Sequence, residues 1–270
     1  MKIYDKKLAY PYFVWMVLFT VVPLFIVVYY AMTDAEGNFT LNNLTSISGY
    51  GSVFARSLLL ALIATVICLV IAFPVGYFLS RLRVNKQHIM LMLVMLPMWM
   101  NFLLRTIAWQ SLLEKTGVIN MILQSIGLPK QNLINTEGAI ILGMIYNFLP
   151  FMVLPIYNVL IKIDRNVINA ARDLGANSVQ TFWKVIFPLS IPGVISGITM
   201  VFVPALTTFV ISDLLGGGKI LLIGNVIEQS FKQNSNWHVG SGLSLVLMVF
   251  IIASMALVAK YDNEDGGAAF

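Results

Sequence analysis

The chain has 270 residues, of which 59% are hydrophobic and 11% are charged, whereas an ordinary soluble domain is about 25% charged. This composition excludes a soluble enzyme or binding domain and predicts an integral membrane protein, because no polar stretch is long enough to hold a core of its own. The 17 Lys and Arg outnumber the 12 Asp and Glu, but they form no basic stripe with interleaved aromatic residues. The excess therefore favours membrane topology over nucleic-acid binding.

Residues for metal, redox or nucleotide chemistry are too few or wrongly spaced. The two histidines and the one cysteine, Cys68, cannot build a metal cage or a disulfide. We expect Cys68, which lies within an apolar run, to face lipid or another helix. Gly217, Gly218 and Lys219 superficially resemble a phosphate loop, but its first glycine and the Ser or Thr after the lysine are missing. We therefore predict no metal site and no cofactor bound by this chain.

Six apolar stretches are long enough to be membrane spans, each of which needs roughly 20 residues to cross about 30 Å of hydrocarbon. The first exceeds the core of about 7–15 residues found in a signal peptide and lacks a small-x-small cleavage site, so we expect it to be retained. The predicted fold is all-α, with one transmembrane domain at residues 1–260 and a polar tail at 261–270. The spans are placed near residues 8–32, 54–82, 89–113, 138–161, 191–215 and 241–259.

The distribution of cations predicts which side of the membrane each loop faces. With both termini inside, the inner side holds Lys2, Lys6, Lys7, Arg81, Arg83, Lys86, Lys162, Arg165, Arg172, Lys184 and Lys260. The outer side keeps only Arg56, Arg105, Lys115, Lys130, Lys219 and Lys232. The positive-inside rule therefore places both termini and the loop at 162–190 in the cytoplasm.

Prolines within the predicted spans free backbone carbonyls, which is tolerated only where neighbours or a water-filled path satisfy them again. A single such proline is usually an ordinary kink, whereas several together indicate helices bent around a cavity. Five positions are of this kind: Pro74, Pro97, Pro150, Pro155 and Pro204.

Ionisable residues near membrane depth are costly and by default indicate function. We expect Arg56 and Arg105 to snorkel to the outer interface. Asp213, at the end of the fifth span, is either a helix cap or a cation site, and the sequence leaves both open. Together with aromatic and amide groups in mid-span, it would suit an organic cation through charge pairing and cation–π attraction. The substrate-path candidates are Asp213, Trp99, Tyr146 and Asn147.

The polar loop at 162–190 carries the most specific pattern in the chain. Five residues form an apolar stripe at helical spacing, Ile163, Val167, Ala170, Ala171 and Leu174, with Arg165, Asn169 and Arg172 on the other side. Asp164 is the expected N-cap and Gly175 the expected stop. Ser178 is expected to cap a second short helix, which Pro188 would end. We therefore predict a short helix-turn-helix beside the membrane.

This loop resembles the EAA loop of ABC importer permeases. That motif reads Glu-Ala-Ala, a glycine four residues beyond the second alanine, and a Leu-Pro pair; here Asn169 replaces the usual Glu and Phe187 the usual Leu. In that family the loop is a coupling helix that docks into a groove on a separate ATPase subunit. The alternative is an amphipathic interfacial helix that only tethers two spans. The resemblance implies coupling roles for Asn169, Ala170, Ala171, Arg172, Asp173, Gly175 and Pro188.

A wider resemblance covers the chain up to about Lys260. The stretches PALTTFVISDLLGGGKILLIGN at 204–225 and AARDLG at 170–175, with the six-span layout, are similar to the B-type permeases of spermidine/putrescine ABC importers. This implies a type I importer fold and a non-enzymatic transport subunit in the bacterial cell membrane. It also implies three kinds of partner: a C-type permease, a cytoplasmic ATPase dimer that binds ATP and Mg²⁺, and an extracytoplasmic polyamine-binding protein.

Two alternative functions remain open from the residues alone. One is an ABC permease for another solute, such as ferric iron, thiamine or a phosphonate. The other is a stand-alone secondary carrier or channel, although such proteins often contain inverted repeats and acidic relay residues. The sequence contains no evident repeat and one candidate acid, Asp213.

Overall fold

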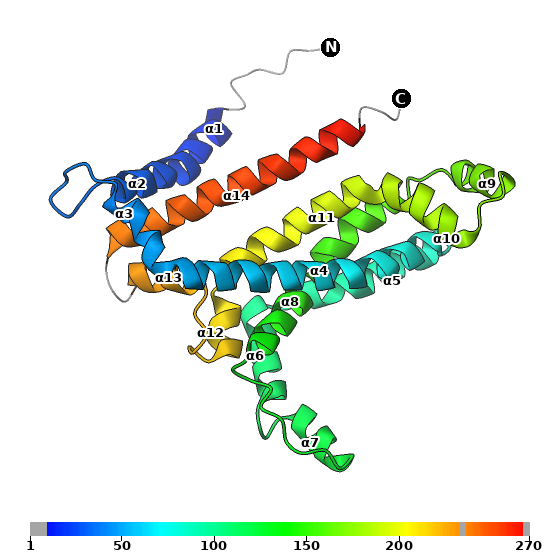
Figure 1. Ribbon diagram of the computed structural model, residues 1–270, viewed down its shortest axis with the longest axis horizontal. Helices are drawn as coiled ribbons and strands as arrows, with labels where there is room; N and C mark the ends of the chain where they lie inside the picture. Colours follow the sequence, from blue (N-terminus) through cyan, green and yellow to red (C-terminus); the bar gives the residue numbers. More distant parts are fainter. Residues whose placement is uncertain (1–9, 233–235, 267–270) are drawn as a thin grey trace. The chain divides into compact units, whose positions relative to one another are not determined.

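The structure, a computed structural model, describes residues 10–232 and 236–266 (Figure 1). Within these residues regular structure is helical apart from one isolated bridge between Thr33 and Phe39, so the predicted all-α class is confirmed. The chain divides into two compact units. One contains the residues up to Ser52 and Val226–Ala253, and the other contains Val53–Asn225 and the residues from Ser254 onward. The predicted inner cations Lys2, Lys6 and Lys7 and residues 267–270 of the predicted tail lie outside the described residues.

The first unit contains the N-terminal span and most of the C-terminal one. Its helical segments are α1 (Tyr10–Met16), a π-helical turn (Val17–Val21), α2 (Val22–Ala31), α3 (Asn42–Thr45), a 3-10 turn (Ser46–Tyr50), most of α13 (Ile223–Lys232) and much of α14 (Trp237–Gly266). The ring of Tyr30 packs against Trp237 and His238, at 6.2 and 5.3 Å between centroids. These contacts hold α2 to the start of α14. Residues 261–266, predicted as polar tail, continue α14.

The second unit contains the remaining helices. They are α4 (Gly51–Arg81), α5 (Val84–Met95), a 3-10 turn (Leu96–Trp99), α6 (Phe102–Leu113), α7 (Val118–Ser125), α8 (Glu137–Leu160), α9 (Arg165–Asp173), α10 (Ser178–Thr181), a π-helical turn (Phe182–Ile186), α11 (Phe187–Thr207) and α12 (Val210–Gly216). In Figure 1, α4, α8 and α11 run alongside one another, with α9 and α10 at one end and α12 at the other.

Two glycines allow α11 to lie directly against α8. A Cβ atom added at Gly193 would lie 2.8 Å from the carbonyl oxygen of Pro155, and one added at Gly197 would lie 2.6 Å from the sulfur of Met152. Close approach through small residues is the usual way in which membrane spans pack. Cys68 of α4 also faces α8, with its sulfur 3.9 Å from a carbonyl oxygen of that helix. Of the two surroundings expected for Cys68, the structure therefore shows the helix.

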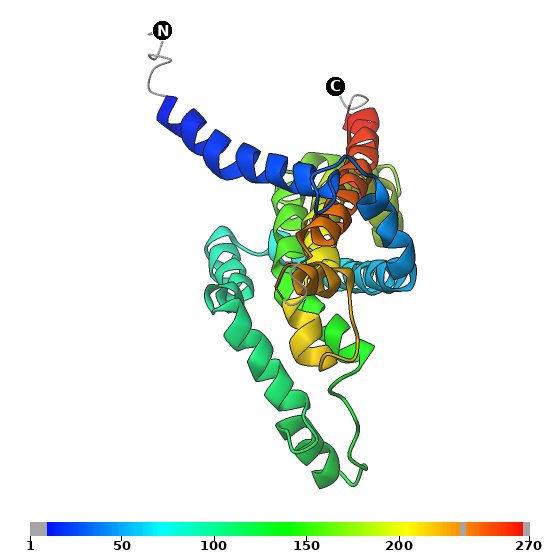
Figure 2. The same ribbon diagram turned by 90° about the vertical axis from the view of Figure 1, so that its left-hand side faces the viewer.

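Five helices are long and apolar enough to cross a membrane, and a bent pair makes a sixth if it counts as one span. This pair includes the predicted span 89–113, and the chain bends by 86° between its two helices. Pro97 lies in the 3-10 turn. Asn101 then caps α6, since its side chain accepts hydrogen bonds from the N–H groups of Leu103 at 2.9 Å and Leu104 at 3.3 Å. Figure 2 shows α6 leading away from this bend, with α7 beyond it.

The helix of the fifth predicted span, 191–215, begins earlier and ends earlier than expected. A helix long enough to span runs from Ser178 to Thr207, and α12 follows as a separate short helix. Asn177, rather than Ser178, caps α10. The Asn177 side chain accepts from the N–H of Gln180 at 2.8 Å, while the Gln180 side chain accepts from the N–H of Asn177 at 3.0 Å. This reciprocal pair is a capping box.

Pro188 does not end a helix, contrary to the prediction, but lies in the first turn of α11. A π-helical turn precedes it, in which the N–H of Phe187 donates to the carbonyl of Phe182. The same arrangement precedes Pro23, where the N–H of Val22 donates to the carbonyl of Val17. In both places the helix widens just before the proline, so the ring and the missing N–H are accommodated without a break.

Candidate functional site

The predicted boundaries of the first loop helix, α9, are confirmed. The carboxylate of Asp164 accepts a hydrogen bond from the N–H of Asn166 at 2.9 Å, as an N-cap does. Beyond the other end, Gly175 has a φ of +87°, and an added Cβ would meet nothing within 4 Å. Glycine is therefore favoured here by the left-handed backbone rather than by lack of space.

The apolar stripe of α9 is only partly covered by the rest of the unit. Val167 is 46% exposed and Leu174 is 89% exposed, whereas Ile163 and Ala171 are half-buried. The residue that anchors the helix is Ile168, which lies beside the stripe and is only 5% exposed. Exposed apolar side chains indicate a contact surface where they form a patch, whereas single ones are ordinary. Here Val167, Ala170 and Leu174 are all exposed and recur at helical spacing.

The candidate coupling residues are divided between two sides of α9. An open groove of about 410 Å³ lies beside Gly175 and is lined by Ala171, Leu174, Gly175, Ala176, Gln180, Lys184 and Val185. A separate cavity of about 370 Å³ is lined by Arg81, Arg165, Ile168, Asn169 and Arg172. Ala170, Asp173 and Pro188 are exposed and line neither.

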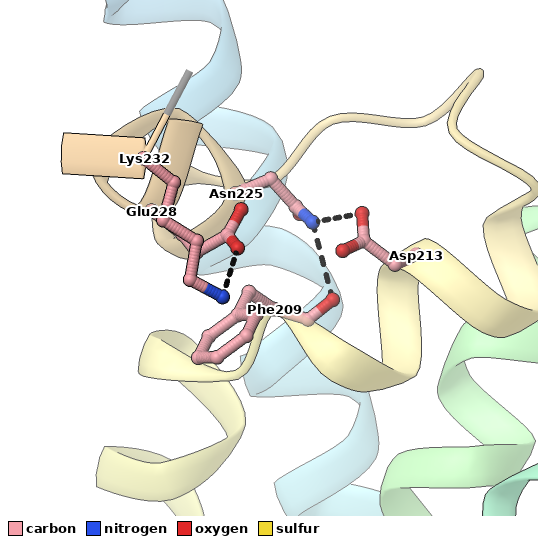
Figure 3. A network of polar contacts seen from close by, with 5 residues as sticks. All are labelled: Phe209, Asp213, Asn225, Glu228 and Lys232. Atoms are coloured by element: carbon pink, nitrogen blue, oxygen red, sulfur yellow. Dashed lines mark hydrogen bonds and ion pairs between the residues drawn. The ribbon is translucent and has the colours of Figure 1, made fainter. Parts of the chain in front are cut away.

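At the opposite end of the unit, one buried asparagine organises the segment between α11 and α13. Asn225 is fully buried; its carbonyl oxygen accepts from the hydroxyl of Ser212 at 2.5 Å and from the N–H of Leu222 at 3.0 Å. Its amide nitrogen donates to the carbonyl of Phe209 at 3.1 Å and to the carboxylate of Asp213 at 2.6 Å (Figure 3). Two donors and two acceptors are thereby satisfied by one side chain.

These contacts bear on the two alternatives for Asp213. The N-cap of α12 is Phe209, with no side-chain capping bond, and Asp213 lies within the first turn rather than before it. The carboxylate is fixed by Asn225, yet the residue is exposed. The geometry therefore does not support a capping role, and it holds a negative charge in place where solvent can reach it.

Arg105 does not snorkel to a surface, contrary to the prediction, but is only 6% exposed. Its Nη1 donates to the carbonyl of Pro97 at 2.5 Å, and its guanidinium carbon lies 5.7 Å from the ring centroid of Tyr146. Trp109 packs edge-on against the same ring at 5.3 Å. Arg105 thus satisfies the carbonyl of Pro97 at the bend between α5 and α6, and it covers one face of Tyr146, a predicted substrate-path residue. Arg56, by contrast, remains half-exposed and pairs with a carboxylate 3.4 Å away.

The other two path candidates differ sharply in exposure. Asn147 is 1% exposed; its amide nitrogen donates to the carbonyl of Gly143 at 2.8 Å, whereas its carbonyl oxygen has no hydrogen-bond partner within the described chain. Side chains of α12 pack over Gly143, where a Cβ would lie 2.9 Å from Ile211. Trp99 is 74% exposed at the broken span. The structure therefore brings the helix carrying Asp213 next to Asn147, but it does not bury Trp99 beside them.

Sequence reasoning missed two asparagines with clear structural roles. Asn101 caps α6 at the broken span, and Asn225 connects the segment that follows α11. Both lie within or beside apolar runs, where an amide is costly unless it is hydrogen-bonded. That cost is the signal that could have identified them.

Comparison with known proteins identifies the family. Residues 72–261 match the family model described as binding-protein-dependent transport system inner membrane component. The spermidine/putrescine transport system permease protein PotB of Haemophilus influenzae is 39% identical over 249 residues, which cover 88% of this chain and 87% of that protein. PotB of Escherichia coli strain K12 is 38% identical over 268 residues, which cover 93% of this chain and 98% of that protein.

Solved structures share the fold at low sequence identity. A crystal structure of a bacterial ABC transporter involved in the import of the acidic polysaccharide alginate matches with a TM-score of 0.81 and 13% identity, over 98% of this chain and 96% of that one. A second alginate ABC transporter structure, in complex with an alginate pentasaccharide-bound periplasmic protein, matches with a TM-score of 0.75 and 15% identity, over 94% of this chain and 91% of that one. The expected importer permease fold is thus confirmed. The chain belongs to the binding-protein-dependent transport system inner membrane component family, as a multi-pass membrane protein.

Proposed function

We propose that this chain is a membrane permease subunit of an ATP-driven importer of polyamines such as spermidine and putrescine. The observation that carries the proposal is the similarity to two spermidine/putrescine permeases along nearly the whole length of both chains. The role is transport rather than catalysis.

Family membership implies a second permease subunit, an ATPase and a periplasmic binding protein as partners. We take the second permease to be of the C type and the binding protein to recognise polyamines. ATP and Mg²⁺ would be bound by the ATPase dimer. We also place residues 1–260 in the transmembrane domain, with both termini and the loop at 162–190 in the cytoplasm, on the strength of the cation distribution.

The exposed side of α9 is the proposed docking surface for the ATPase. Leu174 and Val167 present apolar area that this chain leaves uncovered, and the groove beside Gly175 adjoins it. Closure of the ATPase dimer on ATP would move α9. A short loop joins α9 to α8, and α10 with the π-helical turn joins it to α11, which packs against α8. Such coupling is a shift between inward-open and outward-open states, and it requires different contacts in the two states.

The substrate path would use the fixed carboxylate of Asp213, which suits an ammonium group. Asn147 offers a second acceptor, because its buried carbonyl oxygen has no partner in the described chain. Tyr146 is engaged by Arg105, so a polyamine could contact this ring face only after that side chain moves. Trp99 would contact substrate only from its exposed position.

Uptake of labelled spermidine tests the proposal. The chain and its neighbouring subunits would be expressed in cells lacking their own polyamine uptake. Accumulation should be energy-dependent and should be inhibited by unlabelled putrescine, but not by thiamine, ferric iron or a phosphonate. Competition by one of these solutes instead would assign the permease to that solute.

A further inference from the structure

The cavity beside α9 adjoins a second one, and together they form a pocket where the spans end. The second cavity, of about 250 Å³, shares Arg81, Arg165 and Ile168 with the first. Arg81 is the last residue of α4, and Leu160, which lines the second cavity, is the last residue of α8. The pocket therefore lies at the end of two apolar spans, which is the level of lipid headgroups in a membrane.

Three arginines line this pocket without a matching anion. Within residues 10–232 and 236–266, no carboxylate lies within 4.0 Å of the guanidinium of Arg81, Arg165 or Arg172; the ion pairs found there involve other residues. Asp164, the neighbour of Arg165, directs its carboxylate to the N–H and side chain of Asn166. Three like charges around one cavity repel one another, and a bound anion would reverse the sign of this interaction.

Arg81 is held in position at the pocket wall. Its Nη2 donates to the hydroxyl of Tyr77 at 3.2 Å, and its guanidinium carbon lies 5.0 Å from the centroid of the same ring. Both residues line the second cavity. A guanidinium presents paired N–H donors that match the oxygens of a phosphate group.

The rest of the pocket wall is partly polar, with Ser80, Gln87 and Asn169, and partly apolar. The aliphatic side chains are Leu160 at the end of α8, Ile161 directly after it, Ile168 of α9, and Ile186 of the π-helical turn before α11. A free inorganic anion gains nothing from these aliphatic side chains, whereas a lipid has an acyl chain to place along them. We propose that this pocket, named here the Arg81–Arg165 pocket, binds the phosphate group of an anionic phospholipid at the membrane interface. Basic pockets between spans on the cytoplasmic side are suited to such headgroups. The inference requires neither the substrate nor the ATPase docking proposed above.

Phospholipid retention by the purified full chain, with any subunits that accompany it, tests the proposal. The protein would be exchanged into neutral detergent, titrated with phosphatidylglycerol or phosphatidylcholine, and analysed by native mass spectrometry. We expect phosphatidylglycerol to be retained and phosphatidylcholine to be lost. Each basic residue near an anionic surface contributes about 1 kcal/mol, so the double variant Arg81→Gln/Arg165→Gln should bind phosphatidylglycerol about 25-fold more weakly.

Two further variants make the result specific. Arg83→Gln removes an exposed cation two residues from Arg81 that does not line the pocket, and it should bind as the unmodified chain does. Asn169→Asp introduces a carboxylate of the same shape into the pocket, and it should weaken binding even if the double variant fails to fold. Equal retention of both lipids, or equal binding by the Arg83→Gln and double variants, would overturn the proposal. So would displacement of phosphatidylglycerol by equimolar inorganic phosphate, or binding that appears only after an accompanying ATPase is removed.

Discussion

At the α12 end of the second unit, Asn225 makes four hydrogen bonds within the chain and is fully buried. At the α9 end, Leu174 is 89% exposed, and Arg81 and Arg165 line an open cavity without a carboxylate partner among the described residues. The first end satisfies its own polar groups, whereas the second exposes apolar area and unpaired charge. The break between α11 and α12 is therefore stabilised within the chain, whereas the loop that carries α9 leaves groups exposed for contact with other molecules.

The largest effect is expected on stability, at the α12 end of the second unit, where the polar groups bond to one another. Asn225→Leu would remove four hydrogen bonds, each contributing about 0.5–1.5 kcal/mol, and would leave the buried N–H of Leu222 without its acceptor. We therefore expect a loss of several kcal/mol and a clearly lower thermal unfolding temperature in detergent. Asn132→Leu, at an exposed asparagine in the same unit, provides the control and should unfold as the unmodified chain does. Equal stability of the two variants would show that the α12 end is not organised by Asn225.

The second effect concerns contact with another subunit. Leu174→Glu places a charge on the exposed α9 face and should reduce retention of the ATPase during purification at least tenfold, a change of about 1.4 kcal/mol, with unchanged unfolding temperature. Ile126→Glu is a matched control, because Ile126 also follows a helix and precedes a glycine with positive φ, Gly127. If both variants retain the ATPase, α9 is not its docking site.

Gly175 offers an independent test of the same surface. Gly175→Val forces a β-branched residue into a left-handed backbone conformation, which costs roughly 1–2 kcal/mol, and should displace the loop. Spermidine uptake should fall while membrane insertion continues. Gly127→Val creates the same strain, since Gly127 has a φ of +83° and similarly open surroundings. It should leave spermidine uptake intact, and loss of uptake in both variants would mean that strain alone is responsible.

A smaller effect separates charge from hydrogen bonding at Asp213. Asp213→Asn keeps the size of the side chain and an acceptor for Asn225 but removes the negative charge. We expect uptake of labelled spermidine to fall several-fold, with little change in unfolding temperature. Glu114→Gln removes an exposed charge elsewhere and should transport normally. Wild-type kinetics in Asp213→Asn would remove this residue from the path.

The smallest effect concerns the α10 cap. Asn177→Ala removes both the side-chain acceptor and the fixed geometry of the capping box, which should cost about 1 kcal/mol. Ser178→Ala should cost close to nothing, because the Ser178 side chain does not cap the helix. Thermal unfolding of the two variants distinguishes them, and a larger cost for Ser178→Ala would reverse the assignment of the cap.

The sequence predicted the features that depend on strong local patterns. Long apolar runs identified the helical membrane fold, and Asp164 and Gly175 marked the ends of α9 because each has a backbone preference of its own. The prediction that Pro188 ends a helix was wrong because a π-helical turn allows the helix to continue past the proline. This geometry has no clear signature in the residues. Local pattern therefore determines where helices begin more reliably than whether they continue.

The candidate sites depended on contacts between distant segments, which a sequence pattern does not show. The burial of Arg105 follows from the carbonyl of Pro97 and the ring of Tyr146, the second of which lies on another helix. The hydrogen bond between Asp213 and Asn225 likewise forms because the chain after α12 turns back and places the start of α13 beside α12. Residue type alone correctly selected Asp213 as unusual but did not identify its partner.

The most direct test of the central claim is spermidine uptake into sealed proteoliposomes that contain the full assembly, with ATP supplied only on the side where α9 lies. We expect uptake that requires ATP on that side and that falls at least tenfold in Leu174→Glu. Spermidine uptake that proceeds equally without ATP, or that is unchanged in Leu174→Glu, would contradict it.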